Sequence, residues 1–174
     1  IVSEAYVLNL IEDNNKFEIC ERQASRFGLE ITRWIAEDGR IGKNNLDWIR
    51  YMQEPWAEID EKLGRKAIDK PGAWGYLLTM KAIFEDAISK DHKSIAVFDD
   101  DFIFSKSFDH SFSRLVEVLD ESWEIIYLGA SQWLWDEVSF SNQPYYSPDE
   151  NTNGSFAVIY RNSVFQQILE QIEE

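Results

Sequence analysis

Ser94-Ile-Ala-Val-Phe-Asp-Asp-Asp101 is the most informative stretch of this 174-residue chain. Residues 94–98 are uncharged and mostly apolar, which is typical of a buried strand. Three carboxylates follow at once, and Phe102-Ile-Phe104 continues the apolar character behind them. We therefore expect a central strand that carries three acidic side chains to one edge of a sheet.

Strand and helix patterns alternate on both sides of this stretch, and no repeat or linker interrupts them. Gly28 is expected to end the first helix, and Pro71-Gly72 to break the chain before a later one. The order predicts one α/β domain, residues 1–174, with a mainly parallel sheet flanked by helices. The predicted strands are 5–10, 29–35, 94–98, 124–128 and 155–160, and the predicted helices are 15–27, 43–50, 54–66, 73–90, one capped by Ser107 and one beginning at Ser163.

The composition excludes several classes of protein. Seventeen basic residues against thirty-two acidic ones give a net charge of −15, which repels nucleic acid and anionic membrane surfaces. The single cysteine, Cys20, excludes an internal disulfide and a cysteine-rich zinc site. No apolar run approaches the roughly 20 residues of a membrane span. An anionic ligand would therefore need a metal ion or local backbone amides to offset the charge of the chain.

The triplet Asp99, Asp100 and Asp101 is the strongest candidate for chemistry. Adjacent carboxylates raise the cost of ionising one another, and a hard divalent cation such as Mg²⁺, Mn²⁺ or Ca²⁺ relieves that cost. In an extended segment Asp99 and Asp101 point to the same side, so both can reach one ion. The alternative is a solvated acidic turn. The apolar residues on both flanks favour metal binding.

Other strand ends add candidates, because ligands of parallel α/β sheets bind at the carboxyl ends of the strands. Asn9 follows the first predicted strand, and Asp38 lies in the turn after the second. We expect both at the edge that carries the acidic triplet.

Several motifs together resemble glycosyltransferase family 25, which includes lipopolysaccharide-type galactosyltransferases and relatives of the procollagen galactosyltransferases. They are Ala5-Tyr-Val-Leu-Asn-Leu10, Glu37-Asp-Gly39, Gly72-Ala-Trp-Gly-Tyr-Leu-Leu-Thr-Met80, Ile95-Ala-Val-Phe-Asp-Asp-Asp101 and Ile126-Tyr-Leu-Gly129, in that order. The resemblance covers nearly the whole chain. It implies a GT-A-like, Rossmann-type domain, complete or truncated at its C-terminus. It also implies transfer of a sugar, galactose by analogy, from a UDP-sugar donor to a glycan or lipopolysaccharide acceptor in the cytoplasm or at the inner face of a membrane.

The same resemblance implies roles for individual residues. Asp99 and Asp101 would be the outer residues of an Asp-x-Asp motif that holds Mn²⁺ or Mg²⁺ against the diphosphate. Asn9, Asp38 and Asp100 would bind the nucleotide, with Asp38 accepting from a ribose hydroxyl or the uracil imide.

The segment 131–148 is rich in aromatic residues, which are natural platforms for sugar rings. Trp133 and Trp135 are two positions apart, so in an extended loop they would share one face and could stack an acceptor sugar. An inverting transfer needs a base for the acceptor hydroxyl, and Asp136 and Glu137 lie in the same loop. We expect the acceptor platform and the catalytic base there.

Two other readings remain open from the sequence. One is a non-catalytic domain of the same fold that binds a nucleotide-sugar or carbohydrate without turnover. The other is a Ca²⁺-binding interaction module, which is less favoured because no loop with spaced calcium ligands is present.

Overall fold

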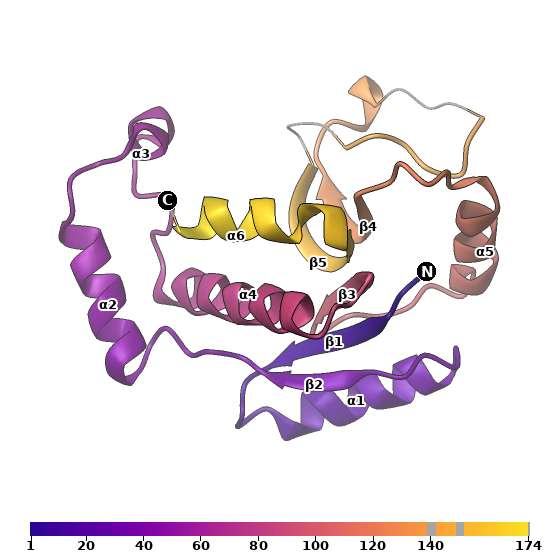
Figure 1. Ribbon diagram of the computed structural model, residues 1–174, viewed down its shortest axis with the longest axis horizontal. Coiled ribbons are helices and arrows are strands. Elements are labelled where there is room, and N and C mark those ends of the chain that lie inside the picture. Colours follow the sequence, from indigo (N-terminus) through magenta and orange to yellow (C-terminus); the bar gives the residue numbers. More distant parts are fainter. Residues whose placement is uncertain (139–141, 149–151, 174) are drawn as a thin grey trace.

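A computed structural model of the chain describes residues 1–138, 142–148 and 152–173 (Figure 1). The described chain forms one mixed sheet of five strands with helices on both faces. Its elements are β1 Glu4–Asn9, α1 Asn14–Ser25, β2 Thr32–Ile35, α2 Gly42–Gln53, α3 Glu58–Leu63, α4 Pro71–Ser89, β3 Ser94–Asp99, α5 Phe108–Val118, β4 Ile125–Gln132, the 3₁₀ turn η1 Trp135–Glu137, β5 Thr152–Arg161, the 3₁₀ turn η2 Asn162–Val164 and α6 Phe165–Glu173.

The sheet has the strand order β2-β1-β3-β5-β4, and only part of it is paired in parallel. β1 pairs in parallel with β2 and β3, whereas β5 pairs antiparallel with both β3 and β4. The expectation of a mainly parallel sheet is therefore correct for β1–β3 and wrong for the other pairings. The sequence pattern could not distinguish the two cases, because side chains alternate with the same period in parallel and antiparallel strands.

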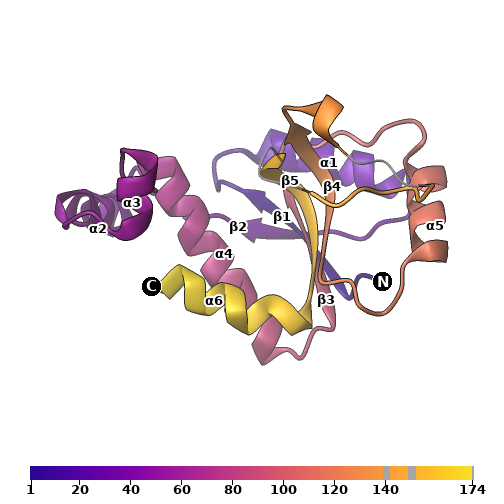
Figure 2. The ribbon, with the colours of Figure 1, turned by 90° about the horizontal axis from the view of Figure 1, so that it is seen from above.

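Helices α4 and α6 cover one face of the sheet, and α1 and α5 pack on the other, which Figure 2 shows from above. Alternate residues of each strand enter opposite cores. On β3, Ile95 and Val97 pack in the core with residues of α4 and α6, whereas Ala96 and Phe98 pack in the core on the α1 side. β3 ends at Asp99, and Asp100 and Asp101 lie in the turn that follows, so the expectation of an extended triplet is wrong beyond Asp99.

Local sequence signals explain where several helices begin and end. Gly28 has a positive φ of 63°, and the next amide, of Leu29, donates to the carbonyl of Ala24, which ends α1 as expected. Pro71 does not break the chain but occupies the first turn of α4, where its missing N–H costs nothing. Ser107 does precede α5, but its hydroxyl makes no capping hydrogen bond.

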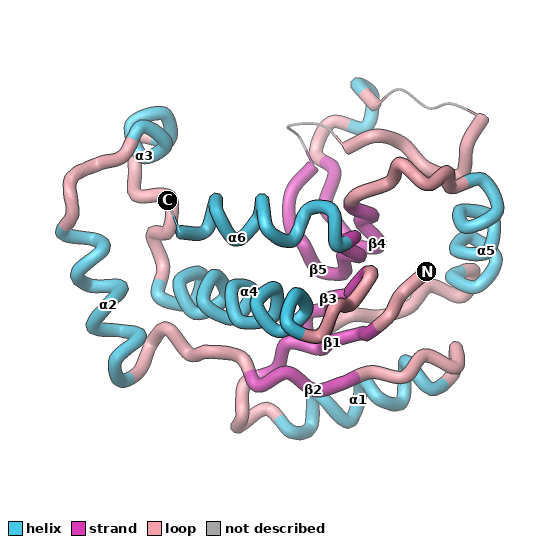
Figure 3. The backbone as a smooth tube through the Cα atoms, in the orientation of Figure 1, coloured by secondary structure: helices cyan, strands magenta, loops and turns pink. Residues whose placement is uncertain are grey.

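Helices α2 and α3 project away from the sheet as an arm (Figures 1, 2 and 3). The base of the arm is fixed by a buried ion pair in which the Lys66 ammonium lies 3.0 Å from the Asp60 carboxylate. Tyr51 of α2 stacks on Trp74 of α4 with ring centroids 5.3 Å apart. The ring contact joins α2 to the first turn of α4, and the ion pair holds α3 to the segment that follows it. Nowhere in the described chain is a helix both long and apolar enough to cross a membrane.

Candidate functional site

The ends of three strands assemble the candidate site. The parallel register pairs Asn9 with Ile35 and Leu8 with Asp99, so β1, β2 and β3 end at the same edge of the sheet. The turn 36–39 and the triplet 99–101 leave from this edge. The structure thus brings together the strand ends that the sequence predicted as neighbours.

The carboxylate of Asp100, the middle residue of the acidic triplet, has a hydrogen bond and an ion pair within the protein. Asp100 accepts a hydrogen bond of 2.7 Å from the side-chain amide of Asn9, and the Lys16 ammonium lies 3.5 Å from its other carboxylate oxygen. Its backbone carbonyl also accepts a hydrogen bond from the Cys20 thiol at 3.3 Å. Asp100 therefore faces α1, where an amide donor and an ammonium group are its partners.

The two outer carboxylates, in contrast, are free. Among the residues that the structure describes, neither Asp99 nor Asp101 has a hydrogen bond or ion pair to its side chain. Asp99 is partly buried and Asp101 is exposed. Burial, followed by the charges of Asp101 and Asp100, raises the pKa of Asp99 to about 6. A half-buried carboxylate without a donor or cation is a costly arrangement in an isolated fold, and a ligand would relieve it.

The surroundings of Asp99 are aromatic and hydroxyl-bearing. Tyr76 of α4 lies within electrostatic range of Asp99, and its hydroxyl is hydrogen-bonded to that of Ser155 at 2.6 Å. Burial is the first cause of a raised pKa for Tyr76, and the charge of Asp99 adds to it. This contact ties α4 to the start of β5 beside the triplet. Neither Tyr76 nor Ser155 was predictable from the sequence as a site residue, because a tyrosine in an apolar helix is usually a core residue.

The oxygen atoms of Asp99 and Asp101 fit a hard divalent cation. Within the described residues, no three His, Cys, Asp or Glu side chains gather closely enough to hold an ion by themselves. Two free carboxylates would leave most of the coordination sphere to water or to a ligand.

Asn9 lies at the predicted edge but beneath its surface. The side chain is 1% exposed, and its amide nitrogen donates both to Asp100 and to the backbone carbonyl of Asp13, at 3.1 Å. Its amide oxygen has no hydrogen-bond partner. In this arrangement Asn9 holds Asp100 in place. A role in the uridine pocket stays a prediction that rests on the position of the residue alone.

Asp38 is paired with a neighbouring arginine at the rim of the site. Its carboxylate accepts hydrogen bonds from the backbone amide, Nε and Nη2 of Arg40, at 2.8, 2.8 and 2.7 Å. The guanidinium holds the pKa of Asp38 below its usual range. A nucleotide that uses Asp38 would therefore meet an Asp–Arg pair, which offers an acceptor together with a cationic donor.

The turn that carries Asp38 is fixed against the first turns of α4. The hydroxyl of Thr79 accepts a hydrogen bond of 2.9 Å from the Glu37 amide and donates one of 2.8 Å to the Gly75 carbonyl. A Cβ added at Gly75 would lie only 2.6 Å from the Gly39 nitrogen, so the two backbones touch here because both residues are glycine. The Glu37-Asp-Gly39 turn is thus packed directly against residues 72–80 of α4, and this packing holds the turn in place beside the site.

The predicted acceptor residues are arranged differently from the expectation. β4 continues to Gln132, and η1 begins at Trp135, so the segment that holds Trp133 and Trp135 is not extended throughout. The assumption of one shared face in an extended loop is therefore wrong. Both rings are accessible, Trp133 at 71% and Trp135 at 53%, and Trp135 packs edge-on against Tyr146 with centroids 5.6 Å apart.

The candidate bases lie in the same short turn. Asp136 and Glu137 are both part of η1, and Asp136 is exposed. Among the described residues, no hydrogen bond or ion pair joins Asp136 to the triplet. Their role as base stays a prediction.

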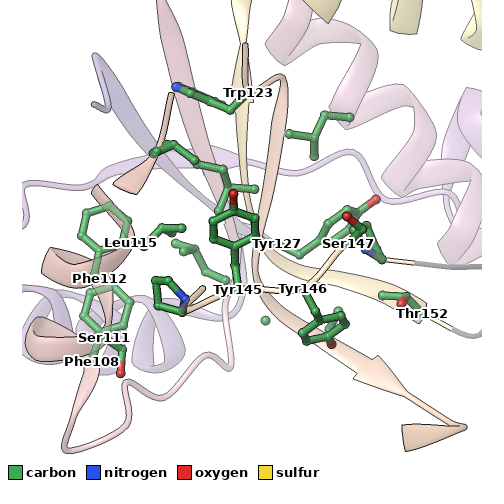
Figure 4. A pocket seen from close by; sticks show the side chains of 18 of the residues that line it. Phe108, Ser111, Phe112, Leu115, Trp123, Tyr127, Tyr145, Tyr146, Ser147 and Thr152 are labelled. Carbon is green, nitrogen blue, oxygen red and sulfur yellow. The ribbon is translucent and has the colours of Figure 1, made fainter. Parts of the chain in front are cut away.

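A cavity of about 610 Å³ lies away from the triplet, between β4, α5 and residues 144–148 (Figure 4). Its walls include Phe108, Phe112, Tyr127, Tyr145 and Tyr146, but none of the three aspartates. The cavity is therefore separate from the acidic site.

Comparison with known proteins adds no family assignment. A scan against protein-family models gives no match for this chain, and a search of curated proteins finds no similar sequence.

Proposed function

We propose that this chain is a metal-dependent glycosyltransferase domain of the GT-A type, which binds a UDP-sugar at the carboxyl edge of β1–β3 and transfers the sugar to a glycan or lipopolysaccharide acceptor. One observation carries the proposal. In the Asp-Asp-Asp triplet the middle carboxylate has Asn9 and Lys16 as partners, and neither outer carboxylate has a hydrogen bond or ion pair to another described residue. That is the pattern expected of an Asp-x-Asp motif that presents two oxygen ligands to one cation.

Electrostatics supports the need for such a cation. The chain has a net charge of −15, and the site edge itself is acidic, so a diphosphate would be repelled in the absence of a counter-charge. Mn²⁺ or Mg²⁺ on Asp99 and Asp101 would neutralise the diphosphate and stabilise it as a leaving group.

The other residues of the edge would position the donor. The Asp38–Arg40 pair lies at the rim, where it could accept from a ribose hydroxyl or the uracil imide and donate to an anionic oxygen. Tyr76 and Ser155 form a hydroxyl pair next to Asp99 that could donate to the sugar. Asn9 would act indirectly, by keeping Asp100 turned away from the metal.

A second candidate function is a domain that binds the same nucleotide-sugar without turnover. The exposed position of Asp136 favours it, because in the described structure no neighbour orients this carboxylate as a base. Turnover distinguishes the two functions, since both predict metal-dependent nucleotide binding.

The experiment is a screen of UDP-sugars for thermal stabilisation of the protein, with Mn²⁺ and with EDTA. The proposal predicts stabilisation by at least one UDP-sugar only when the metal is present, and loss of that effect in Asp101→Ala. Asp109→Ala removes an exposed acidic residue of α5 and is the matched control, which should behave as the wild type. Equal stabilisation in EDTA would refute the metal site.

The acceptor platform has its own test. Replacing both Trp133 and Trp135 with alanine should raise the acceptor KM and leave UDP and Mn²⁺ binding intact, because both rings are exposed and outside the core. Stacking of one ring on a sugar contributes on the order of 1 kcal/mol, so the double variant should lose about 2 kcal/mol, or roughly thirtyfold, in acceptor affinity. Unchanged acceptor kinetics would remove the two tryptophans from the site.

A further inference from the structure

We propose that the outer edge of β4 binds an extended peptide segment with basic flanks from a partner protein, by addition of a strand to the sheet. β4 is the last strand in the order β2-β1-β3-β5-β4, so β5 pairs with one of its edges and the other is open. The proposal is independent of the proposed transferase function.

The cavity of about 610 Å³ follows this open edge. Six successive residues of β4, Ile125 to Ala130, line it. Because successive side chains of a strand point to opposite faces, a cavity that touches all six must run along the strand and include its backbone. Its volume lies within the usual range of ligand sites, about 300–1,000 Å³.

The direction of the free backbone groups can be assigned from the pairing with β5. The carbonyl of Glu124 accepts a hydrogen bond of 2.8 Å from the Arg161 amide. Antiparallel ladders alternate, so the groups of Ile126 face β5 as well, and those of Ile125 and Tyr127 face outward into the cavity. Within the described residues no other strand pairs with this edge. An open row of donors and acceptors of this kind is a template for another strand.

The walls of the cavity suit the side chains of such a strand. On one side lie Phe108, Phe112 and Leu115 of α5, and on another lie Tyr145 and Tyr146 (Figure 4). Alternate side chains of an added strand would enter this apolar space, and the others would stay at the surface. β-branched and small apolar side chains therefore fit best.

The charge around the groove indicates basic flanks on the partner. Residues 106–124, which lead through α5 into β4, carry five acidic side chains and two basic ones, all of them exposed, namely Asp109, Glu117, Asp120, Glu121, Glu124, Lys106 and Arg114. Of these, Asp120 lines the cavity itself. A second copy of this chain would bring the same acidic rim and would be repelled, whereas lysine or arginine residues beside the docking segment would be attracted. The observations thus favour a basic peptide over self-association.

The test uses two labelled peptides with the same strand-forming core, KKTVTVTKK and EETVTVTEE, and measures binding by fluorescence anisotropy. The basic peptide should bind and the acidic one should not, and the affinity should fall with added salt. Hydrogen exchange of the wild-type complex should show new protection at the amides of Ile125 and Tyr127. Protection located elsewhere, absence of binding by the basic peptide or equal binding of both peptides would overturn the proposal.

A backbone variant completes the test. Ile125→Pro deletes an outward N–H at the first residue of β4, where proline is tolerated, and should weaken peptide binding by about tenfold. Ile125→Val keeps the N–H and should bind within about twofold of the wild type. Equal binding by both variants would contradict strand addition. If the protein dimerised with increasing concentration and the dimer protected the same amides without peptide, the proposal would be overturned. The edge of β4 would then bind a second copy of this chain.

Discussion

Replacing Asp99 with asparagine should stabilise the protein at neutral pH, although it removes a residue of the candidate site. Burial and two neighbouring carboxylates raise the pKa of Asp99 from 3.8 to about 6. This rise in pKa corresponds to a free-energy difference of roughly 3 kcal/mol between the charged and the neutral form. Because the side chain is only partly buried, solvent screening reduces the expected gain for Asp99→Asn to about 1–2 kcal/mol in the free energy of unfolding.

The sign of the pH dependence follows from linkage. The folded-state pKa of Asp99 lies above its unfolded value, so this residue lowers stability as the pH rises from about 4 to about 6, and the loss is complete above that window. Asparagine carries no charge, and the advantage of the variant should therefore be largest near neutral pH and vanish below about pH 4.

Urea denaturation of wild type and Asp99→Asn at several pH values measures this difference. Glu21→Gln on α1 is the matched control, because Glu21 is exposed and should change stability by less than about 0.5 kcal/mol at any pH. Destabilisation by Asp99→Asn at neutral pH, or a gain that persists in acid, would show that Asp99 is not an unpaired, desolvated carboxylate.

Two further predictions concern the supports of the site and are checked by the same denaturation assay. Gly75→Ala should lower the free energy of unfolding by at least about 2 kcal/mol, because the added methyl group would collide with the backbone of the 36–39 turn. Gly72→Ala, in the same helix, meets open space and should raise it by about 0.5–1 kcal/mol. Equal effects of the two variants would contradict the close packing at Gly75. Lys66→Met should lower the free energy of unfolding by about 3–5 kcal/mol, because it leaves the buried Asp60 without its cation. Lys62→Met breaks an exposed ion pair and should lower it by less than about 0.5 kcal/mol. A small loss for Lys66→Met would mean that the base of the arm does not depend on the ion pair.

The sequence predicted the parts of the fold that local patterns determine. The apolar run of β3, the helical stripe of α4 and the glycine at the end of α1 each specify an element through its own residues. The direction of β5 could not be predicted in this way, because alternation has the same period in parallel and antiparallel strands. That direction depends on how the chain returns from β4.

For the candidate site, the sequence predicted which strand ends form it but not how the side chains there are arranged. The triplet and Asn9 could be placed at one edge because parallel strands end together. The division of the triplet into one bonded and two free carboxylates depends on Lys16 and on the buried amide of Asn9, which come from other parts of the chain. The course of the segment around Trp133 was not predictable, because the extension of β4 past Gly129 depends on its pairing with β5.

The most direct test of the central claim is isothermal titration of UDP into the protein with Mn²⁺ and, separately, with EDTA. Since Asp99 and Asp101 are free but supply only two ligand groups, the metal and the diphosphate should each strengthen binding of the other. We predict UDP affinity at least about tenfold higher with Mn²⁺ than with EDTA. UDP binding of equal affinity in both conditions, or no UDP binding in either, would contradict the proposed function.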